Sequence, residues 1–418
     1  MLKDMLDIKF IRGFKNFTFL SFGNIISQVI SFIGMLFIMN ILGTKSYGIY
    51  TTAFSFVGFF SLFTLNQMNK VLIREGAEKV EQLGKLLQRY FGLNASLAGI
   101  SIILCLTAAI FSPYENQLKI YIGILAFDLI FQTFNGYINT IFQVVEKMQY
   151  MAFVNILQRV TFVIFAILFL YLGYGILSLI LIMLFSRIII LYINYKLSRN
   201  FIKFRIRRGI NFDPKIMKAT MIFSILLFLG YLSYRIDILM ISFLRPMEDV
   251  GIYGAATKLM DPFWRFFNFI SIAFFPVFVK HFKKGQISGK KFFSLTALAT
   301  TIVLFITIII IFCARFFIPI FLPKYIQAIP IYSVLVFSFA IHMASSPFNF
   351  SLQATHNEWT LLKINWIPPL LNIIGNIILL YYFGLIGIAI STLIVLSTSF
   401  LIKGIAGWIV LKKQGKFY

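Results

Sequence analysis

Between residues 235 and 265, five charged residues lie in apolar runs, outside the polar connection at 245–249. The spacing of three of them points to a shared task. Lys258, Asp261 and Arg265 are spaced i, i+3 and i+7, so a helix would carry all three on one face. One carboxylate between two cations leaves that face positively charged. Lysine offers phosphate oxygens a point charge and arginine a bidentate fork. The face therefore predicts a wet cationic cavity for an anion, with ion pairs that hold helices together as the alternative.

The other charges of this stretch cannot satisfy one another. Arg235 and Asp237 are two residues apart, so a helix would point them about 200° apart. At least one of them needs a partner elsewhere in the fold. Pro262 follows Asp261 directly, removes a backbone hydrogen bond and predicts a hinge in the helix.

Further polar side chains lie in apolar runs, where an ionised group costs a few kcal/mol and usually faces a bundle interior or water. Asp128 is expected to pair with Arg159 or Arg187. The predicted roles fall into three groups: a cationic substrate cavity (Lys258, Arg265, Arg235, Arg159, Arg187), a polar cavity wall (Asn24, Gln28, Asn66), and ion coupling to H⁺ or Na⁺ or structural pairing (Asp128, Asp237, Asp261).

The elements that must position these residues are membrane-spanning helices. The 418 residues are 60% hydrophobic and 12% charged, about half the charge fraction of a soluble domain. Apolar runs of 18 or more residues recur, and they lack the alternation of a barrel strand. We predict an all-α polytopic membrane protein with about twelve spans: 17–41, 47–67, 90–112, 118–142, 150–172, 174–195, 219–243, 250–279, 292–320, 326–353, 359–383 and 385–411.

The basic residues assign an orientation to these spans. Connections after even-numbered spans are basic and those after odd-numbered spans are poor in charge, so most of the 38 Lys and Arg lie on one side. The positive-inside rule makes that side cytoplasmic, with both termini. The net charge of +24 is thus a topology signal, and nucleic acid is excluded as a partner. The amphipathic stretch 70–89 is expected in the headgroup layer, with anionic membrane lipids as partners.

The chain divides into two halves that resemble each other. We predict an N-terminal lobe at 1–198 with spans one to six, a basic cytoplasmic linker at 199–218, and a C-terminal lobe at 219–418 with spans seven to twelve. Gly-Ile-Tyr recurs at 48–50 and 251–253, at the start of the second span of each half. The matching position favours an internal repeat over chance.

Motifs of soluble enzymes are missing from the sequence. It contains no Walker loop, no zinc-ligand spacing and no nucleophile elbow. Cys105 and Cys313 lie in apolar runs and are expected to be core thiols. We therefore predict no catalytic residues, no metal site and no cofactor.

Several stretches carry a family resemblance: LGTKSYGIYTTAFSF after span one, LIREGAE after span two, and YRIDILMISFLRPMEDVGIYGAATKL across spans seven and eight. With the two six-span halves, they resemble the polysaccharide-transporter branch of the multidrug/oligosaccharidyl-lipid/polysaccharide exporter superfamily, and most closely its Wzx-type flippases of O-antigen and capsule repeat units. The resemblance implies two lobes in a V shape around an alternating-access cavity. Lys258 and Arg265 would belong to the family's cationic lumen, and Asp237 matches its recurrent aspartate in span seven.

The resemblance also implies a substrate and a location. The substrate would be an undecaprenyl-diphosphate-linked oligosaccharide, moved to the periplasmic leaflet of a bacterial inner membrane, with the polysaccharide polymerase and chain-length regulator as further partners. Two outward-moving charges would release about 4–5 kcal/mol per 100 mV, so ion coupling is not required. Related lipid II flippases carry arginines inside span one, where this chain has Asn24 and Gln28, and have extra C-terminal spans. Both departures speak against lipid II.

Two alternatives remain open. A multidrug exporter of the same superfamily should have an acidic cavity for cationic drugs, whereas the intramembrane charges here are positive in excess. A membrane polysaccharide polymerase or glycosyltransferase usually carries a large outer loop, and the outer connections here are short.

Overall fold

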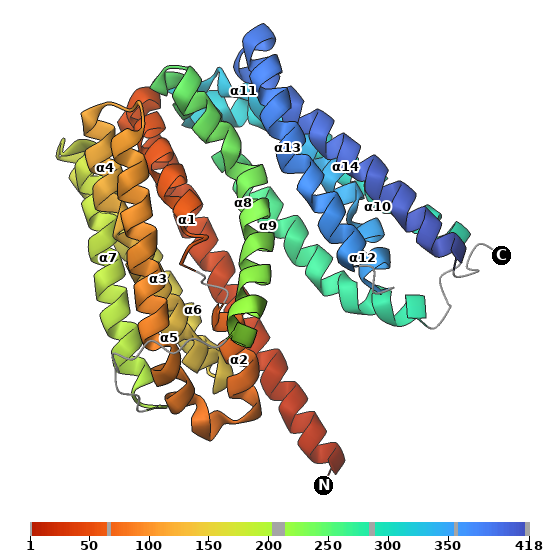
Figure 1. Cartoon of the computed structure of the whole chain (residues 1–418). Coiled ribbons are helices and arrows are strands. Elements are labelled where there is room, and N and C mark those ends of the chain that lie inside the picture. The colour runs from red at the N-terminus through yellow and green to blue at the C-terminus, as the bar shows by residue number, and fades with distance from the viewer. Residues whose placement is uncertain (1, 65–67, 203–213, 284–288, 355–357, 414–418) are drawn as a thin grey trace. The chain divides into compact units, whose positions relative to one another are not determined.

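The computed structural model describes residues 2–64, 68–202, 214–283, 289–354 and 358–413, and within these ranges the chain is helical without strands (Figure 1). The all-α prediction is confirmed. The α-helices are α1 (Leu2–Phe60), α2 (Met68–Glu78), α3 (Leu83–Phe111), α4 (Asn116–Ala126), α5 (Asp128–Val144), α6 (Met148–Tyr171), α7 (Gly175–Ser198), α8 (Pro214–Leu244), α9 (Met247–Lys283), α10 (Gly289–Phe321), α11 (Ala328–Ala344), α12 (Ser346–Ala354), α13 (Glu358–Phe383) and α14 (Leu385–Lys413), and short 3₁₀ turns are η1 (Val80–Gln82) and η2 (Pro323–Tyr325).

The first long helix contains the first two predicted spans. A kink at Gly43 separates them, with φ 71° and ψ 179°, a backbone conformation that is almost confined to glycine. The predicted boundary between 41 and 47 lies at this kink. Glycine has no Cβ, so it lets the chain change direction there without an intervening loop.

The fourth predicted span of each half is interrupted. The span at 118–142 is split into α4 and α5 at Phe127, and the span at 326–353 into α11 and α12 at Ser345. Both junction residues keep right-handed helical dihedrals, with φ −64° and ψ −20° at Phe127 and φ −77° and ψ −12° at Ser345, so the breaks are local irregularities and not unwound segments. Asp128 is the residue that follows the first of them.

Nine helical stretches in the described ranges are long and apolar enough to cross a membrane. One of them, Ser21–Phe60, has 40 residues and contains two predicted spans. Helices α8 and α9 cover the predicted spans at 219–243 and 250–279. Many large apolar side chains on these helices are exposed, as expected for surfaces that face lipid. The helices therefore account for the twelve predicted spans.

The chain forms two compact units, and unit 1 comprises residues 1–42 and 49–228. One core cluster of this unit joins α2, α3 and α5, with Leu72 of α2 buried beside Leu83 and Leu87 of α3. Packing against the neighbouring helices removes these leucines from the surface, so they are not available to contact lipid. The placement of the stretch 70–89 in the headgroup layer stays a prediction.

Unit 2 comprises residues 43–48 and 229–418. Within it, residues 43–48 of α1, which follow the kink, cross the start of α9. The contact is made at the two glycines of the repeated motif, Gly48 and Gly251. A methyl group on Gly48 would come within 2.8 Å of the Met247 carbonyl carbon, and one on Gly251 within 2.8 Å of the Thr44 carbonyl carbon. Each glycine thus packs against the residue four positions before the other. This reciprocal geometry supports an internal repeat and gives the Gly-Ile-Tyr motif a packing role.

Candidate functional site

The most polar buried site in unit 2 surrounds the carboxylate of Asp237 on α8. Its Oδ1 accepts hydrogen bonds from Asn372 Nδ2 at 3.0 Å and Asn376 Nδ2 at 2.8 Å, both on α13. Its Oδ2 accepts from the Tyr253 hydroxyl of α9 at 2.5 Å and from the Thr392 hydroxyl of α14 at 3.3 Å. Four helices thus converge on one carboxylate.

The electrostatics of this cluster are unusual because its donors are neutral. Asp237 is 4% exposed, and no ion pair reaches it from the residues that the structure describes. A buried charge is costly unless it is paired or fully hydrogen-bonded. Here four neutral dipoles replace the water that the carboxyl group has lost, and no described cation pairs with it.

Oxygen atoms without a full set of donors lie beside this carboxylate. Asn376 Oδ1 is buried without a hydrogen-bond partner, and Asn372 Oδ1 accepts one long bond of 3.3 Å from Ser391. The Thr392 hydroxyl spans the same region, donating to Asp237 and lying 3.2 Å from the Ile388 carbonyl oxygen. A carboxylate with amide, hydroxyl and carbonyl oxygens is the donor set that hard cations prefer.

Sequence reasoning identified Asp237 but missed its partners. The two asparagines of α13 are spaced i, i+4 in an apolar run and share one helix face, the same signal that singled out Asn24 and Gln28. Tyr253 belongs to the repeated Gly-Ile-Tyr motif, and its hydroxyl has a role in this site. That α8, α9, α13 and α14 meet here could not be read from any local pattern.

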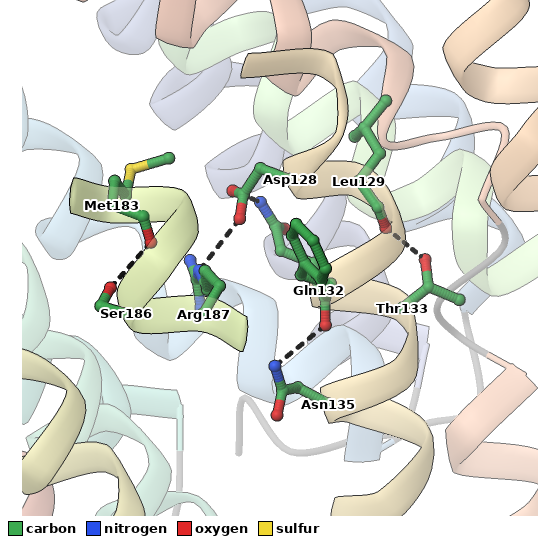
Figure 2. Close-up of polar contacts among 9 residues, drawn as sticks. Asp128, Leu129, Gln132, Thr133, Asn135, Met183, Ser186 and Arg187 are labelled. Atoms are coloured by element: carbon green, nitrogen blue, oxygen red, sulfur yellow. Dashed lines mark hydrogen bonds and ion pairs between the residues drawn. The ribbon is translucent and has the colours of Figure 1, made fainter. Parts of the chain in front are cut away.

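A second buried polar cluster lies in unit 1 around Asp128 (Figure 2). Arg187 Nε of α7 lies 3.0 Å from Asp128 Oδ1, and Gln132 Nε2 donates to Asp128 Oδ2 at 2.5 Å. With its oxygen turned toward the guanidinium, the Gln158 amide of α6 accepts from Arg187 Nη1 at 2.8 Å. Of the two pairings expected for Asp128, the structure forms the one with Arg187, so this cluster is an ion pair across helices.

The face of α9 that opened the sequence analysis contains a second ion pair. Lys258 Nζ lies 2.8 Å from Asp261 Oδ2, with side-chain exposures of 32% and 17%. Arg265 lies one turn further along α9, and its side chain is exposed. The carboxylate of Asp261 balances the charge of Lys258. Arg265 then gives this face of α9 the net positive charge that the spacing predicts. Helix α9 continues through Pro262, so the hinge there stays a prediction.

The remaining predicted residues that the structure describes lie on α1, α6 and α8. Arg159 follows Gln158 on α6 and is exposed, and Arg235 is half-buried on α8. Asn24 and Gln28 are half-buried one turn apart on α1. Asn66 lies outside the described residues, as does most of the linker predicted at 199–218. The cavity roles of these residues stay predictions.

The comparison with protein families identifies the family to which this chain belongs. A model of the family described as "Polysaccharide biosynthesis protein" matches residues 14–282, more than half of the sequence. The chain belongs to that family. A search of the curated proteins finds no matching sequence.

Solved structures of several membrane transporters have a similar fold. "Lipid II flippase MurJ, inward closed conformation" is 18% identical, with a TM-score of 0.69 over 93% of this chain and 87% of that one. An inward-facing "multidrug resistance MATE family transporter of the MOP superfamily" is 14% identical, with a TM-score of 0.73 over 93% and 96%. A MOP superfamily transporter from Pyrococcus furiosus with "reverse polarity of binding pocket" is 15% identical, with a TM-score of 0.59 over 92% and 95%. The fold is that of MOP transporters, as the sequence resemblance implied.

Proposed function

We propose that this chain is a flippase that moves an undecaprenyl-diphosphate-linked oligosaccharide from the cytoplasmic to the outer leaflet for the synthesis of a surface polysaccharide. Membership of the polysaccharide biosynthesis family supports the cargo class. The likeness to a lipid flippase supports the mode of action. Transport without catalysis also agrees with the short outer connections, which favour neither a polymerase nor a glycosyltransferase.

One observation carries the choice of a diphosphate cargo. The α9 face holds two cations and one carboxylate inside a predicted span, and its Lys258–Asp261 pair leaves Arg265 as excess charge. A diphosphate carries roughly two negative charges and needs such a path through a membrane. Multidrug exporters of the same fold are the second candidate, and the structural likeness supports them equally well. Their cationic drugs would be repelled by this face.

The deciding experiment follows the lipid-linked intermediates in a host from which the gene has been deleted. We expect undecaprenyl-linked repeat units to accumulate and the surface polymer to disappear. Complementation with Lys258→Ala or Arg265→Ala should fail, while Lys258→Arg should restore part of the polymer, because it keeps the charge. The matched control is Lys363→Ala, which removes an exposed lysine of α13 in the same unit. Unchanged lipid pools with new sensitivity to cationic dyes would favour the drug exporter.

We further propose that the Asp237 cluster binds a coupling cation, H⁺ or Na⁺, during the transport cycle. Its support is the uncompensated carboxylate beside the unpartnered Asn376 Oδ1. Asp237→Asn removes the charge and keeps the shape, so flipping in proteoliposomes should lose its dependence on a Na⁺ or pH gradient. Asp249→Asn is the control, because Asp249 lies in the same unit and its pair with Arg245 is partly exposed. Gradient dependence that survives Asp237→Asn would leave the cluster with a structural role alone.

A further inference from the structure

An apolar slot in unit 1 lies outside both polar clusters. Its volume is about 380 Å³, within the range of ~300–1,000 Å³ that is usual for ligand pockets, and every lining residue is aromatic or aliphatic. Its walls come from α3, α5 and α7. Phe91 and Phe134 stack with ring centroids 5.3 Å apart, and the Tyr137 ring meets Phe91 edge-on at 5.9 Å. These interlocked rings form a fixed wall.

The wall offers a ligand no polar group. The Tyr137 hydroxyl donates to the Leu87 carbonyl oxygen, so its hydrogen-bonding capacity is used within the protein. On the α7 side the slot is lined by Leu191 and Tyr195, and by Tyr192, which is 65% exposed. A polar ligand would lose its hydrogen bonds to water here and gain none from the protein. A hydrocarbon chain has no such hydrogen bonds to lose, and its transfer out of water is favourable. The slot therefore selects for hydrocarbon.

Two positively charged side chains lie on α7 just beyond the residues that line the slot. Lys196 follows Tyr195 directly, and Arg199 comes one turn later; both side chains are exposed. The Arg199 guanidinium lies 5.9 Å from the centroid of the Tyr195 ring, above the same aromatic group that lines the slot. Leu191 and Lys196 are five residues apart, about 7.5 Å along the helix. A chain in the slot would thus place its headgroup near two positive charges.

We propose that this slot binds one acyl chain of an anionic phospholipid, with the phosphate of the lipid against Lys196 and Arg199. The lining dictates a hydrocarbon occupant, and the two cations favour an anionic headgroup over a zwitterionic one. The slot lies within unit 1 and uses none of the residues assigned to transport. The lipid is therefore a bound partner of the resting protein, whatever its cargo.

The test is native mass spectrometry of the full-length protein, released from detergent with phosphatidylglycerol or phosphatidylcholine added. We expect one phosphatidylglycerol molecule to be retained in preference to phosphatidylcholine. Leu191→Trp fills the slot and should abolish that retention. Leu181→Trp is the matched control, because Leu181 lies on the same helix, is 47% exposed and does not line the slot. Tyr192→Ala, at an exposed position that should not disturb folding, opens the slot and should weaken retention.

The charge requirement is tested separately. A lysine or arginine near a membrane surface adds about fivefold to the affinity for an anionic lipid. Lys196→Gln and Arg199→Gln should each lower the preference for phosphatidylglycerol by about that factor. Lys147→Gln, an exposed residue of the same unit, should leave it unchanged. Retention that survives Leu191→Trp, or equal retention of both lipids, would overturn the proposal. Preferential retention of a polyprenyl phosphate would reassign the slot to the cargo's tail.

Discussion

The crossing of Gly48 and Gly251 allows a quantitative prediction, because one helix contact contains both residues. Gly48→Ala and Gly251→Ala each place a methyl group 2.8 Å from a carbonyl carbon of the opposite segment. Nonbonded carbon atoms prefer about 3.5–4.0 Å, and the carbonyl oxygens of Met247 and Thr44 lie closer still, so either substitution must separate the two backbones by more than about 1 Å. The obstacle is backbone, which cannot rotate away as a side chain would.

The size of the effect follows from this geometry. Overpacking a close contact typically costs about 1–3 kcal/mol of unfolding free energy, and a backbone obstacle places each variant near the upper end. Both methyl groups push the same two segments apart in the same direction. Once one has separated them, the second finds space already open. The double variant should thus lose about as much as either single variant, with a coupling energy of about −3 kcal/mol.

The assay is the unfolding free energy of the purified protein, measured by denaturant titration and by the thermal midpoint in one detergent. Gly230→Ala is the matched control, since Gly230 lies in the helix α8 of the same unit and has no described neighbour within 4 Å. Alanine should be neutral or gain up to about 1 kcal/mol there from helix propensity. Single variants as stable as this control, or strictly additive losses in the double variant, would refute the close reciprocal crossing.

The remaining predictions concern the kink and the ion pairs. Gly43→Ala should cost about 1–3 kcal/mol of unfolding free energy, measured by the same titration, because alanine strains at φ 71° and ψ 179°. Arg187→Met should cost about 3–5 kcal/mol by leaving Asp128 uncompensated, and adding Asp128→Asn should recover most of that loss; an additive double variant would contradict the pairing. Asp261→Asn should cost less than about 1 kcal/mol, because its pair with Lys258 is partly exposed, while raising the affinity for a diphosphate measured by equilibrium binding; unchanged binding would argue against a cationic face.

The sequence alone determined the class of this protein and predicted its orientation in the membrane. Apolar runs of spanning length specify helices because lipid offers no partner for backbone hydrogen bonds. The basic connections predict a side for each helix end because charged residues cross a membrane with difficulty. The spacing of Lys258, Asp261 and Arg265 placed them on one face because a helix has a fixed period. All of these rules are local in the chain.

Tertiary structure decided which of the intramembrane charges are balanced. The spacing of Arg235 and Asp237 showed that a distant partner was needed, but it could not specify Asn372, 135 residues away, nor Thr392, 155 residues away. Likewise, Asp128 had two possible arginines until the packing of α5 against α7 brought Arg187 to it. Pairings across helices depend on how helices rotate and cross, and many distant side chains together set that geometry. The sequence identified the charged side chains in the apolar runs, and the packing of the helices decided which of them have a partner of opposite charge.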